Sequence, residues 1–212
     1  ESMKSTKAGD FILTINNDCV VDSTYLEKIA STSSTHQRSI VGSLEIEQAT
    51  KRVHTGYLHV DWRKGIWLNQ VKDVNVIKSC DHLSTKGTLF PVEVFQKIGL
   101  LDEVRLPHYG SDFEFTNRAR LNGFKLLLDP DCVVYCDHER TGLTRQSRSV
   151  GYLEVFKLIW SIKSTINVRD QYYLVRLMCP KELRPLNYFR LFIKGIYLLS
   201  LPIRRLFSRK KS

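Results

Sequence analysis

The chain has 212 residues, of which 42% are hydrophobic and 25% charged, and this composition argues against a disordered chain. Its length fits one domain, or one domain with an appendage, and is sufficient to bury a sizeable core. The net charge is +10, but residues 140–212 hold sixteen Lys and Arg against three acids, a net of +13, which leaves −3 for residues 1–139. This asymmetry predicts an anionic partner for the C-terminal segment, either nucleic acid or an anionic membrane surface.

The first part of the chain alternates strand-like and helix-like segments. Strands are predicted at 11–15, 39–47, 52–62 and 87–90, followed by a strand pair within 124–138 around Asp129-Pro130. Helices are predicted at 22–34, 91–99 and 111–123. We expect Asp22 or Ser23 to cap the first helix, and Pro91 and Gly99 to begin and end the second. The alternation predicts an α/β sandwich with a mostly parallel sheet.

The segment after about residue 142 has a different texture. Helical stretches at 150–164 and 168–178 lead to a tail in which Arg and Lys interleave with Leu, Ile and Phe. The longest uncharged run there, Gly195 to Ile203, has nine residues, far fewer than the ~20 that span a bilayer. The pattern favours an amphipathic helix lying in a membrane interface. The alternative is a docking helix followed by a solvated tail.

Five cysteines occur without regular spacing: Cys19, Cys80, Cys132, Cys136 and Cys179. The start of the sequence carries no signal-peptide pattern, so we expect reduced thiols in a cytosolic setting. Cys132, Cys136 and His138 do not supply four ligands at the spacing of a zinc finger. Alternation along this strand instead predicts that Cys132 and Cys136 are small core residues.

Polar side chains with possible chemistry follow the predicted strands or begin a predicted helix: Asn16-Asn17-Asp18, Asp112 with Glu114, and His138. A carboxylate at the carboxyl edge of a parallel sheet lies where such sheets bind ligands. Each position also has a local explanation. Asn-Asn-Asp is a common turn, Asp112 is a suitable helix N-cap, and a single histidine is often structural.

Three stretches, "LTINNDCVVD", "GTLFPVEVFQKIGLLDE" and "HYGSDFEFTNRARLNGFKLLLDPDCVVYCDH", resemble the family 2 glycosyltransferases, which are inverting nucleotide-sugar enzymes of GT-A fold. The likeness is greatest to the bacterial rhamnosyltransferase-like branch. It implies that residues 1–142 are the C-terminal two-thirds of a GT-A domain, a mostly parallel sheet flanked by helices. The family's first strand and its nucleobase-binding acid have no counterpart, so the domain is expected to be truncated at its N-terminus. Residues 143–212 are then a basic, amphipathic helical tail that associates with membrane.

The resemblance also implies a set of site residues. Asp18 occupies the place of the last carboxylate of the family's DxD motif and would hold Mn²⁺ or Mg²⁺ together with His138. Asp112 occupies the place of the catalytic base. Since the family usually has Glu-Asp where this chain has Ser111-Asp112, the base could instead be Glu114. The implied donor and acceptor contacts are Asn16, Asn17, Lys86, Gly87, Thr88, His108 and Tyr109.

General chemistry agrees with these roles. A hard divalent cation neutralises the charge that grows on a leaving diphosphate, and one Asp with one His suits Mn²⁺ somewhat better than Mg²⁺. A sugar hydroxyl needs a positioned carboxylate to accept its proton. Asp112, at a helix start, is expected to stay ionised because the helix dipole favours negative charge there.

The sequence therefore predicts inverting transfer of a sugar from a nucleotide-diphosphate sugar to a glycan or lipid-linked acceptor, in cell-surface polysaccharide synthesis. The enzyme is expected to be cytoplasmic and peripheral on the inner face of the plasma membrane. The alternatives are a non-catalytic fragment or a module that binds membrane or nucleic acid. Against nucleic acid, the basic residues of the tail alternate with apolar ones, and no RRM, KH or finger motif occurs.

Overall fold

The computed structural model describes residues 6–7, 9–65, 68–71, 74–137, 157–161, 164 and 166–209, with the backbone alone at 68–71, 199 and 201–209. The chain forms two compact units, which we describe separately. The first unit comprises residues 1–60, 68–101 and 112–140. The second comprises residues 61–67, 102–111 and 141–212, so it includes two short segments from the middle of the sequence as well as the C-terminal part.

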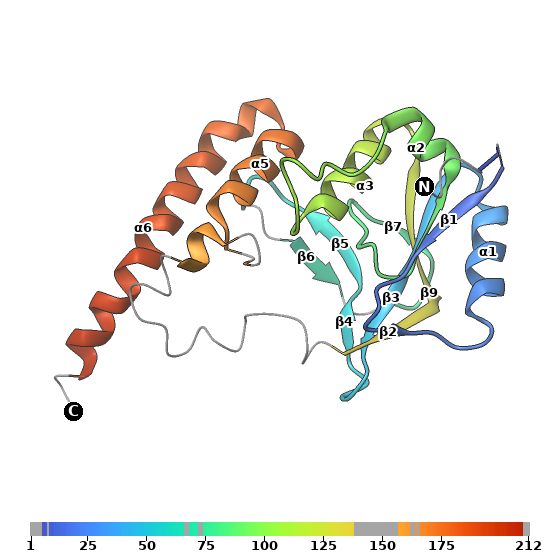
Figure 1. The fold of residues 1–212 in the computed structure, drawn as a ribbon, viewed down its shortest axis with the longest axis horizontal. Helices are drawn as coiled ribbons and strands as arrows, with labels where there is room; N and C mark the ends of the chain where they lie inside the picture. Colours follow the sequence, from blue (N-terminus) through green and yellow to red (C-terminus); the bar gives the residue numbers. More distant parts are fainter. Residues whose placement is uncertain are drawn as a thin grey trace. The chain divides into compact units, whose positions relative to one another are not determined.

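The first unit is built on a sheet with the strand order β1-β8-β3-β9-β2, whose strands are Phe11–Thr14, Thr88–Pro91, Ser39–Glu47, Lys125–Cys136 and Cys19–Val20. Two short strands extend it: β4 (Val53–Thr55) pairs with β3, and β7 (Lys78–Ser79) pairs with β9. A separate two-stranded sheet joins β5 (Tyr57–Val60) to β6 (Leu68–Val71). Most of the predicted strands are therefore present (Figure 1).

The direction of the strands differs from the prediction of a mostly parallel sheet. Among the described strands only β3 and β9 pair in parallel, whereas β1–β8, β8–β3, β9–β2, β3–β4 and β7–β9 are antiparallel. A parallel pair needs a crossover connection, usually a helix. The chain between β3 and β8 instead contains the short strands β4 to β7, and this connection lets β8 enter the sheet in the opposite direction.

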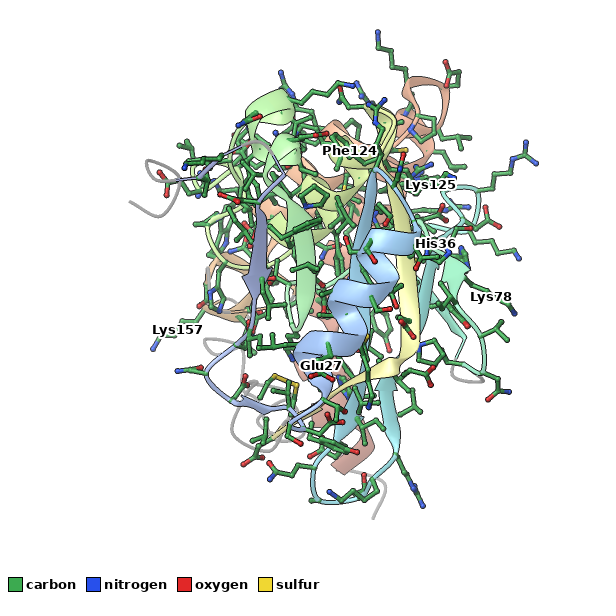
Figure 2. The ribbon with its side chains drawn as sticks, turned by 90° about the vertical axis from the view of Figure 1, so that its right-hand side faces the viewer. Glu27, His36, Lys78, Phe124, Lys125 and Lys157 are labelled. Carbon is green, nitrogen blue, oxygen red and sulfur yellow. A yellow bond between two sulfur atoms is a disulfide. The ribbon has the colours of Figure 1, made fainter. Side chains whose placement is uncertain are left out.

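Helices cover both faces of this sheet. On one face α1 (Tyr25–Thr35) packs Tyr25 and Ile29 against a cluster that includes Val41 and Val134. On the other, α2 (Val92–Ile98) and α3 (Ser111–Leu121) contribute residues such as Phe95 and Phe115 to the larger cluster. Neighbouring residues of β3 serve opposite clusters because side chains alternate along a strand. Figure 2 shows α1 lying over the sheet, with Glu27 near its start and His36 after its end.

The helix ends follow the expected chemistry with small shifts. Thr24 is the N-cap of α1 by position, but Asp22 accepts hydrogen bonds from the backbone N–H (2.8 Å) and the hydroxyl (2.7 Å) of Thr24. Pro91 lies one residue earlier than predicted, at the N-cap of α2. Gly99 ends α2 with φ +77°, a left-handed conformation that favours glycine.

The segment predicted as a strand pair around Asp129-Pro130 is one strand, β9, with an irregularity. Ser43 of β3 pairs with Asp129, and the next residue, Leu44, pairs with Val133. The intervening residues bulge out of the ladder, and the buried Asp129 accepts hydrogen bonds from the Asp131 N–H (2.9 Å) and from the Thr32 hydroxyl of α1. Proline removes a ladder hydrogen bond, so it is tolerated at such a bulge without ending the strand.

Cys19 and Cys136, directly opposite each other on β2 and β9, form a disulfide. The prediction that all thiols are reduced is therefore wrong for this pair, whose sequence separation of 117 residues gave no pairing signal. Cys80, Cys132 and Cys179 are free and buried. Cys132 and Cys136 both belong to the buried cluster under α1, as expected of small core residues.

The second unit contains α5 (Val168–Met178), the 3₁₀ turn η3 (Lys181–Leu183) and α6 (Arg184–Arg209). The Asn167 side chain caps α5 by accepting a hydrogen bond from the Asp170 N–H. Asn187 and Arg190 of α6 both donate to the carbonyl of Trp62, at 2.9 and 3.3 Å, which ties this middle segment to the helix. Much of the predicted helix at 150–164 lies outside the described residues. Of the helices that are described, none combines the length and hydrophobicity that crossing a membrane requires.

Candidate active site

The three strands β1, β3 and β9 run in the same direction, because β1 and β3 are each antiparallel to β8 and β9 is parallel to β3. Their carboxyl ends therefore share one edge of the sheet. The Asn16–Asp18 turn follows β1 at this edge, and the residues after Cys136 follow β9. The start of β8 lies there too, since the Gly87 N–H donates to the Thr14 carbonyl at 2.9 Å.

The Asn16–Asp18 turn is fixed by its backbone. The Asn16 carbonyl accepts from the Cys19 N–H, and the Asp18 carbonyl accepts from the Asp137 N–H, both at 3.2 Å. Asn17 is exposed, and Asp18 is half-buried. The Asp137 bond places Asp18 beside the end of β9, next to the residue that precedes His138. His138 itself lies outside the described residues. Within the described part of the chain, no group of three or more His, Cys, Asp or Glu side chains could hold a metal.

Gly87 and Thr88 are buried at the start of β8. Gly87 has φ +69°, and a Cβ there would come within 2.4 Å of Val134 and 2.7 Å of the Tyr25 hydroxyl. The Gly87 carbonyl accepts from the Ser43 hydroxyl at 2.6 Å. Both residues are therefore held by packing, and the adjacent Lys86 is half-buried.

Glu45 of β3 is a candidate that the sequence prediction missed. Its side chain is buried, with the residue 2% exposed, and it accepts hydrogen bonds from the hydroxyls of Thr55 (3.1 Å) and Ser84. Lys86 Nζ lies 3.8 Å from Glu45 Oε2. The available signal was a carboxylate within a strand whose first seven residues are all buried. A charge in such a strand requires partners, because an isolated buried charge is strongly unfavourable.

Asp112 lies in the first turn of α3 near this cluster. Burial raises the pKa of Asp112 to about 6, and the negative charge of Glu45 adds to the increase, while the Phe113 N–H and Lys86 oppose it. The Phe113 N–H donates to Asp112 Oδ1 at 2.9 Å. The helix dipole was expected to keep the pKa of Asp112 low, but the effect of burial on this pKa is larger. The carboxyl is still ionised at neutral pH, and it titrates much closer to neutrality than an exposed aspartate.

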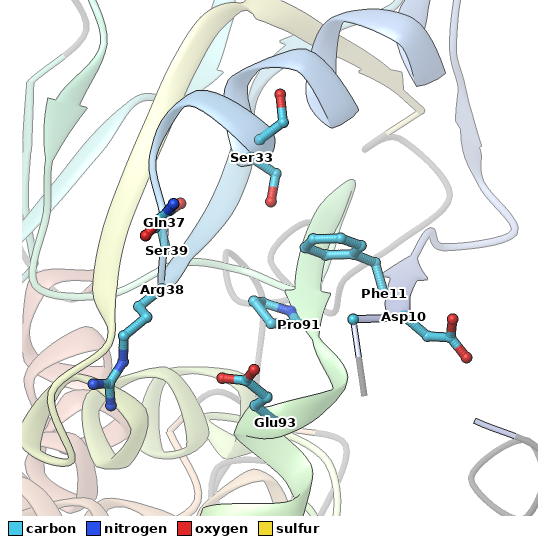
Figure 3. Close-up of a pocket in the computed structure, with 10 residues that line it drawn as sticks. Asp10, Phe11, Ser33, Gln37, Arg38, Ser39, Pro91 and Glu93 are labelled. Carbon is cyan, nitrogen blue, oxygen red and sulfur yellow. The ribbon is translucent and has the colours of Figure 1, made fainter. Parts of the chain in front are cut away.

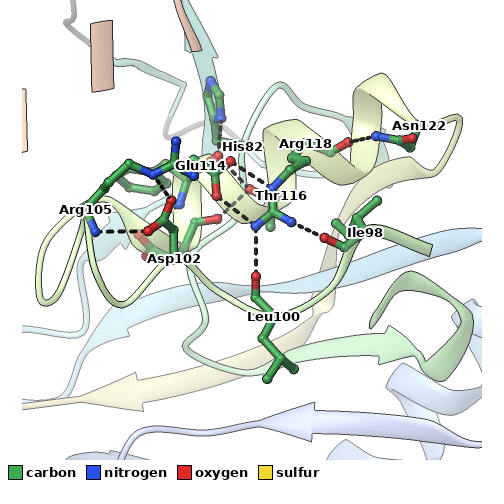
Figure 4. Close-up of polar contacts among 11 residues, drawn as sticks. His82, Ile98, Leu100, Asp102, Arg105, Glu114, Thr116, Arg118 and Asn122 are labelled. Carbon is green, nitrogen blue, oxygen red and sulfur yellow. Dashed lines mark hydrogen bonds and ion pairs between the residues drawn. The ribbon is translucent and has the colours of Figure 1, made fainter. Parts of the chain in front are cut away.

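Glu114 has different surroundings. It is 5% exposed, and its two oxygens accept from Nε (2.8 Å) and Nη2 (3.0 Å) of Arg118, one turn further along α3. Arg118 also donates to the carbonyls of Ile98 and Leu100, so the pair fastens α3 to the segment that follows α2 (Figure 4). These contacts occupy Glu114 in holding the fold.

The loop between β7 and β8 is anchored to the same helix. The Leu83 N–H donates to the Thr116 hydroxyl at 3.3 Å, and a ring nitrogen of His82 lies 3.2 Å from the Phe113 carbonyl. Burial lowers the pKa of His82 to about 4, so this imidazole is neutral at physiological pH and can donate to that carbonyl. The anchoring fixes the loop that carries Ser84 and Lys86.

His108 and Tyr109, also predicted to bind substrate, belong to the second unit. Their rings make an edge contact with centroids 4.5 Å apart. Their role in binding substrate remains a prediction.

A cavity of about 320 Å³ lies elsewhere on the first unit (Figure 3). It is lined by residues at the start of β1, the start of β3, the end of β8 and the end of α1, among them Phe11, Ser39 and Pro91. These are the opposite strand ends from those that carry the predicted site residues. None of the predicted site residues lines this cavity.

No known protein family and no curated protein matches the sequence. Sixty solved chains match the structure. One is GalNAc-T7 crystallised with UDP, GalNAc and Mn²⁺, at 16% identity and a TM-score of 0.51, covering 64% of this chain and 29% of that one. Another is TarS of S. aureus, at 13% identity and a TM-score of 0.44, covering 93% of this chain and 40% of that one. The chain thus spans less than half the length of either structure.

The similarity to GalNAc-T7 shows that the chain has a fold of the GT-A glycosyltransferase type. The fold expected from the sequence is confirmed at this level.

Proposed function

We propose that this chain contains the acceptor-activating part of an inverting glycosyltransferase of family 2, close to the rhamnosyltransferase-like branch, that uses a nucleotide-diphosphate sugar. The observation that carries the proposal is the polar cluster of Asp112, Glu45 and Lys86 near the carboxyl edge of a GT-A-type sheet. The sequence motifs that resemble family 2 support the finer assignment.

Asp112 is the proposed base. Its carboxylate takes the proton of an acceptor hydroxyl while the acceptor oxygen bonds to the anomeric carbon and the bond from that carbon to the diphosphate oxygen breaks. Attack from the face opposite the leaving group inverts the configuration. A base with a pKa of about 6 is ionised at neutral pH yet still a useful proton acceptor. Glu114 is the weaker candidate because Arg118 already binds both of its oxygens.

Asp18 is the proposed protein ligand for Mn²⁺ or Mg²⁺, with His138 as the second. A half-buried carboxylate next to the end of β9 fits a hard cation that takes its remaining oxygens from a diphosphate. The bound ion would supply neutralisation of charge on the leaving diphosphate. Asn16, Asn17 and Lys86 would contact the donor at the same edge, while Gly87 and Thr88 set the backbone course of β8.

The acceptor is proposed to be a glycan or lipid-linked sugar of a cell-surface polysaccharide, met at the inner face of the plasma membrane. Support comes from α6, on which Phe189 and Phe192 are 62% and 65% exposed and which carries Arg and Lys without any acid. Exposed apolar residues combined with basic ones favour an anionic membrane surface.

The test is release of nucleoside diphosphate from a panel of nucleotide-diphosphate sugars, with Mn²⁺ and candidate acceptors. Asp112→Asn should lower turnover by a factor on the order of 10²–10⁴, the contribution of a positioned base. Glu114→Gln should lower it far less, and Glu93→Gln, an exposed carboxylate on α2, serves as the matched control. If transfer persists in Asp112→Asn but is lost in Glu114→Gln, then Glu114 is the base. If neither substitution lowers transfer, the proposal is contradicted.

The metal role is tested separately by Mn²⁺ binding. Asp18→Asn should weaken Mn²⁺ binding measured in the presence of a nucleoside diphosphate by at least tenfold, whereas Asp10→Asn, at the opposite end of β1, should leave it unchanged. Equal Mn²⁺ affinity in the Asp18 variant would remove Asp18 from the site.

A further inference from the structure

The second unit contains an apolar groove of about 440 Å³ between α5 and α6, which lie side by side (Figure 1). Val168 and Tyr172 of α5 form one wall. The α6 residues follow the spacing of a single helix face: Tyr188, Leu191, Phe192, Gly195 and Ile196. Apart from the two tyrosine hydroxyls, the side chains that line it are hydrocarbon. The groove therefore presents hydrocarbon surface, with polar groups where the tyrosines meet.

The tyrosine end of the groove is flanked by positive charge. The rings of Tyr172 and Tyr188 stack with centroids 5.2 Å apart. Arg176 Nη1 lies 3.3 Å from the Tyr172 hydroxyl, and the charges of Arg184 and Arg176 both act on Tyr188. Arg176 is exposed, so its guanidinium is available to a second partner. An anion is therefore favoured at this end.

The other end of the groove is open. A Cβ on Gly195 would meet no atom within 4 Å, and Phe192 and Ile196 are largely exposed. The eight-residue step from Tyr188 to Ile196 corresponds to about 12 Å at 1.5 Å per residue. This length suits an extended hydrocarbon chain, whereas a compact polar ligand would leave most of the apolar wall uncovered.

We propose that this groove binds one hydrocarbon chain of an anionic membrane lipid, with the lipid's charged head at Arg176 and Arg184. The exposed apolar residues of the groove and the cations at its tyrosine end make a lipid the occupant that satisfies both ends. The inference deepens the membrane docking proposed above and rests on that part of the proposed function. It is independent of sugar transfer.

The test is titration of the chain with dodecyl phosphate below its micelle concentration, followed by amide NMR shifts at Tyr188 and Gly195. Inorganic phosphate and dodecyl maltoside provide the head alone and the same chain with a neutral head. We expect saturable binding of dodecyl phosphate at least tenfold tighter than either. Equal binding of inorganic phosphate would show an anion site only, and the absence of saturation would also overturn the proposal.

Gly195→Leu is the decisive variant. It fills the open part of the groove, and Leu is a better helix former than Gly, so the fold should be kept, as circular dichroism would verify. Dodecyl phosphate binding should fall at least tenfold. Arg176→Gln should weaken it about fivefold, and the control Phe189→Ala, which removes an exposed residue outside the groove, should not change it. A different result would overturn the lipid site and keep the membrane docking. In that case Phe189→Ala weakens binding to anionic vesicles, but Gly195→Leu leaves dodecyl phosphate binding unchanged.

Discussion

At the scale of single residues, the environment of each carboxylate separates the candidates that the sequence alone left open. Asp112 and Glu114 are two positions apart on one helix, and such positions do not share a face. Glu114 is enclosed by Arg118, whereas Asp112 lies near Glu45 and Lys86 with a pKa raised to about 6. The spacing predicts that the two carboxylates have different surroundings, and only the structure shows which groups lie beside each one.

The raised pKa of Asp112 predicts the pH dependence of transfer. Only the ionised carboxylate accepts a proton, so kcat/KM should rise with pH through about 6 and level off above it. Glu45→Gln should move this limb to lower pH, because it removes a negative charge that raises the Asp112 pKa. Lys86→Met should move it to higher pH, because it removes a positive charge that lowers the pKa. If the acid limb of kcat/KM moved in the same direction in both variants, Glu45 and Lys86 would not act on Asp112 with opposite charges as proposed.

The same group has a consequence for stability. Because its folded-state pKa is raised, Asp112 contributes to the free energy of unfolding below about pH 3.8, and this contribution is lost as pH rises through about 6. Asp112→Asn removes this loss, so the unfolding free energy of the variant relative to the unmodified protein should rise between pH 4 and pH 7. Urea unfolding at pH 4, 5, 6 and 7 measures the difference, and an unchanged pH dependence would count against the raised pKa.

At the scale of elements, the sequence predicts which segments are strands and helices better than how they connect. The patterns of 39–47, 111–123 and 168–178 each correspond to an observed element within a residue or two. The strand directions could not be predicted, because alternation of apolar residues reports burial and is the same in both directions. The pairing of Cys19 with Cys136 and the contacts of Glu45 join residues far apart in sequence, and no local pattern encodes them.

The Glu114–Arg118 pair should be important for the attachment of α3. Arg118→Met leaves a buried carboxylate without its bidentate partner and the carbonyls of Ile98 and Leu100 without their donor. We expect a loss of roughly 2–4 kcal/mol in unfolding free energy, measured by urea denaturation at pH 7. Arg120→Met, which removes an exposed side chain bonded to Asn117 on the same helix, is the control and should lose less than about 1 kcal/mol. Equal losses would mean that the pair contributes no more than an ordinary surface bond.

The Cys19–Cys136 disulfide gives a prediction that needs no activity assay. Alkylation of the denatured, unreduced protein should label only Cys80, Cys132 and Cys179, and reduction should add two labels. Peptide mass spectrometry would identify the linked pair. Cys19→Ser should then leave Cys136 as a labelled thiol without reduction. Five labels before reduction would show that the two cysteines are adjacent but unbonded in the isolated protein.

At the scale of the whole molecule, the uneven charge accounts for two different surfaces on one chain. The body, with a net charge of −3 over residues 1–139, carries the carboxylates of the candidate site, and the segment from residue 140 carries +13. The proposed diphosphate donor is itself anionic, so a slightly acidic body would need local cations, for which Lys86 and a bound metal are the candidates. The basic segment can act independently on a larger anionic surface.

The tail should therefore bind anionic membranes through charge and apolar residues together. Replacing five basic residues with Gln should release the protein from vesicles that contain anionic lipid: Arg204, Arg205, Arg209, Lys210 and Lys211. Each such charge contributes about 1 kcal/mol near the surface, so the loss in vesicle affinity should exceed a hundredfold in sedimentation assays at low salt. Added salt should likewise weaken vesicle binding of the unmodified protein.

The control removes the same amount of charge from exposed positions outside the tail: Lys7, Arg52, Arg63, Lys64 and Lys125. This variant has the same net charge as the tail variant, so a general electrostatic attraction would weaken both equally. We expect the control to keep most of its vesicle binding, because its substitutions leave the basic residues and the exposed apolar residues of α6 in place. Equal release of both variants would show that the tail acts only through net charge. If the tail variant bound vesicles as tightly as the unmodified protein, these five charges would make no contribution to membrane binding.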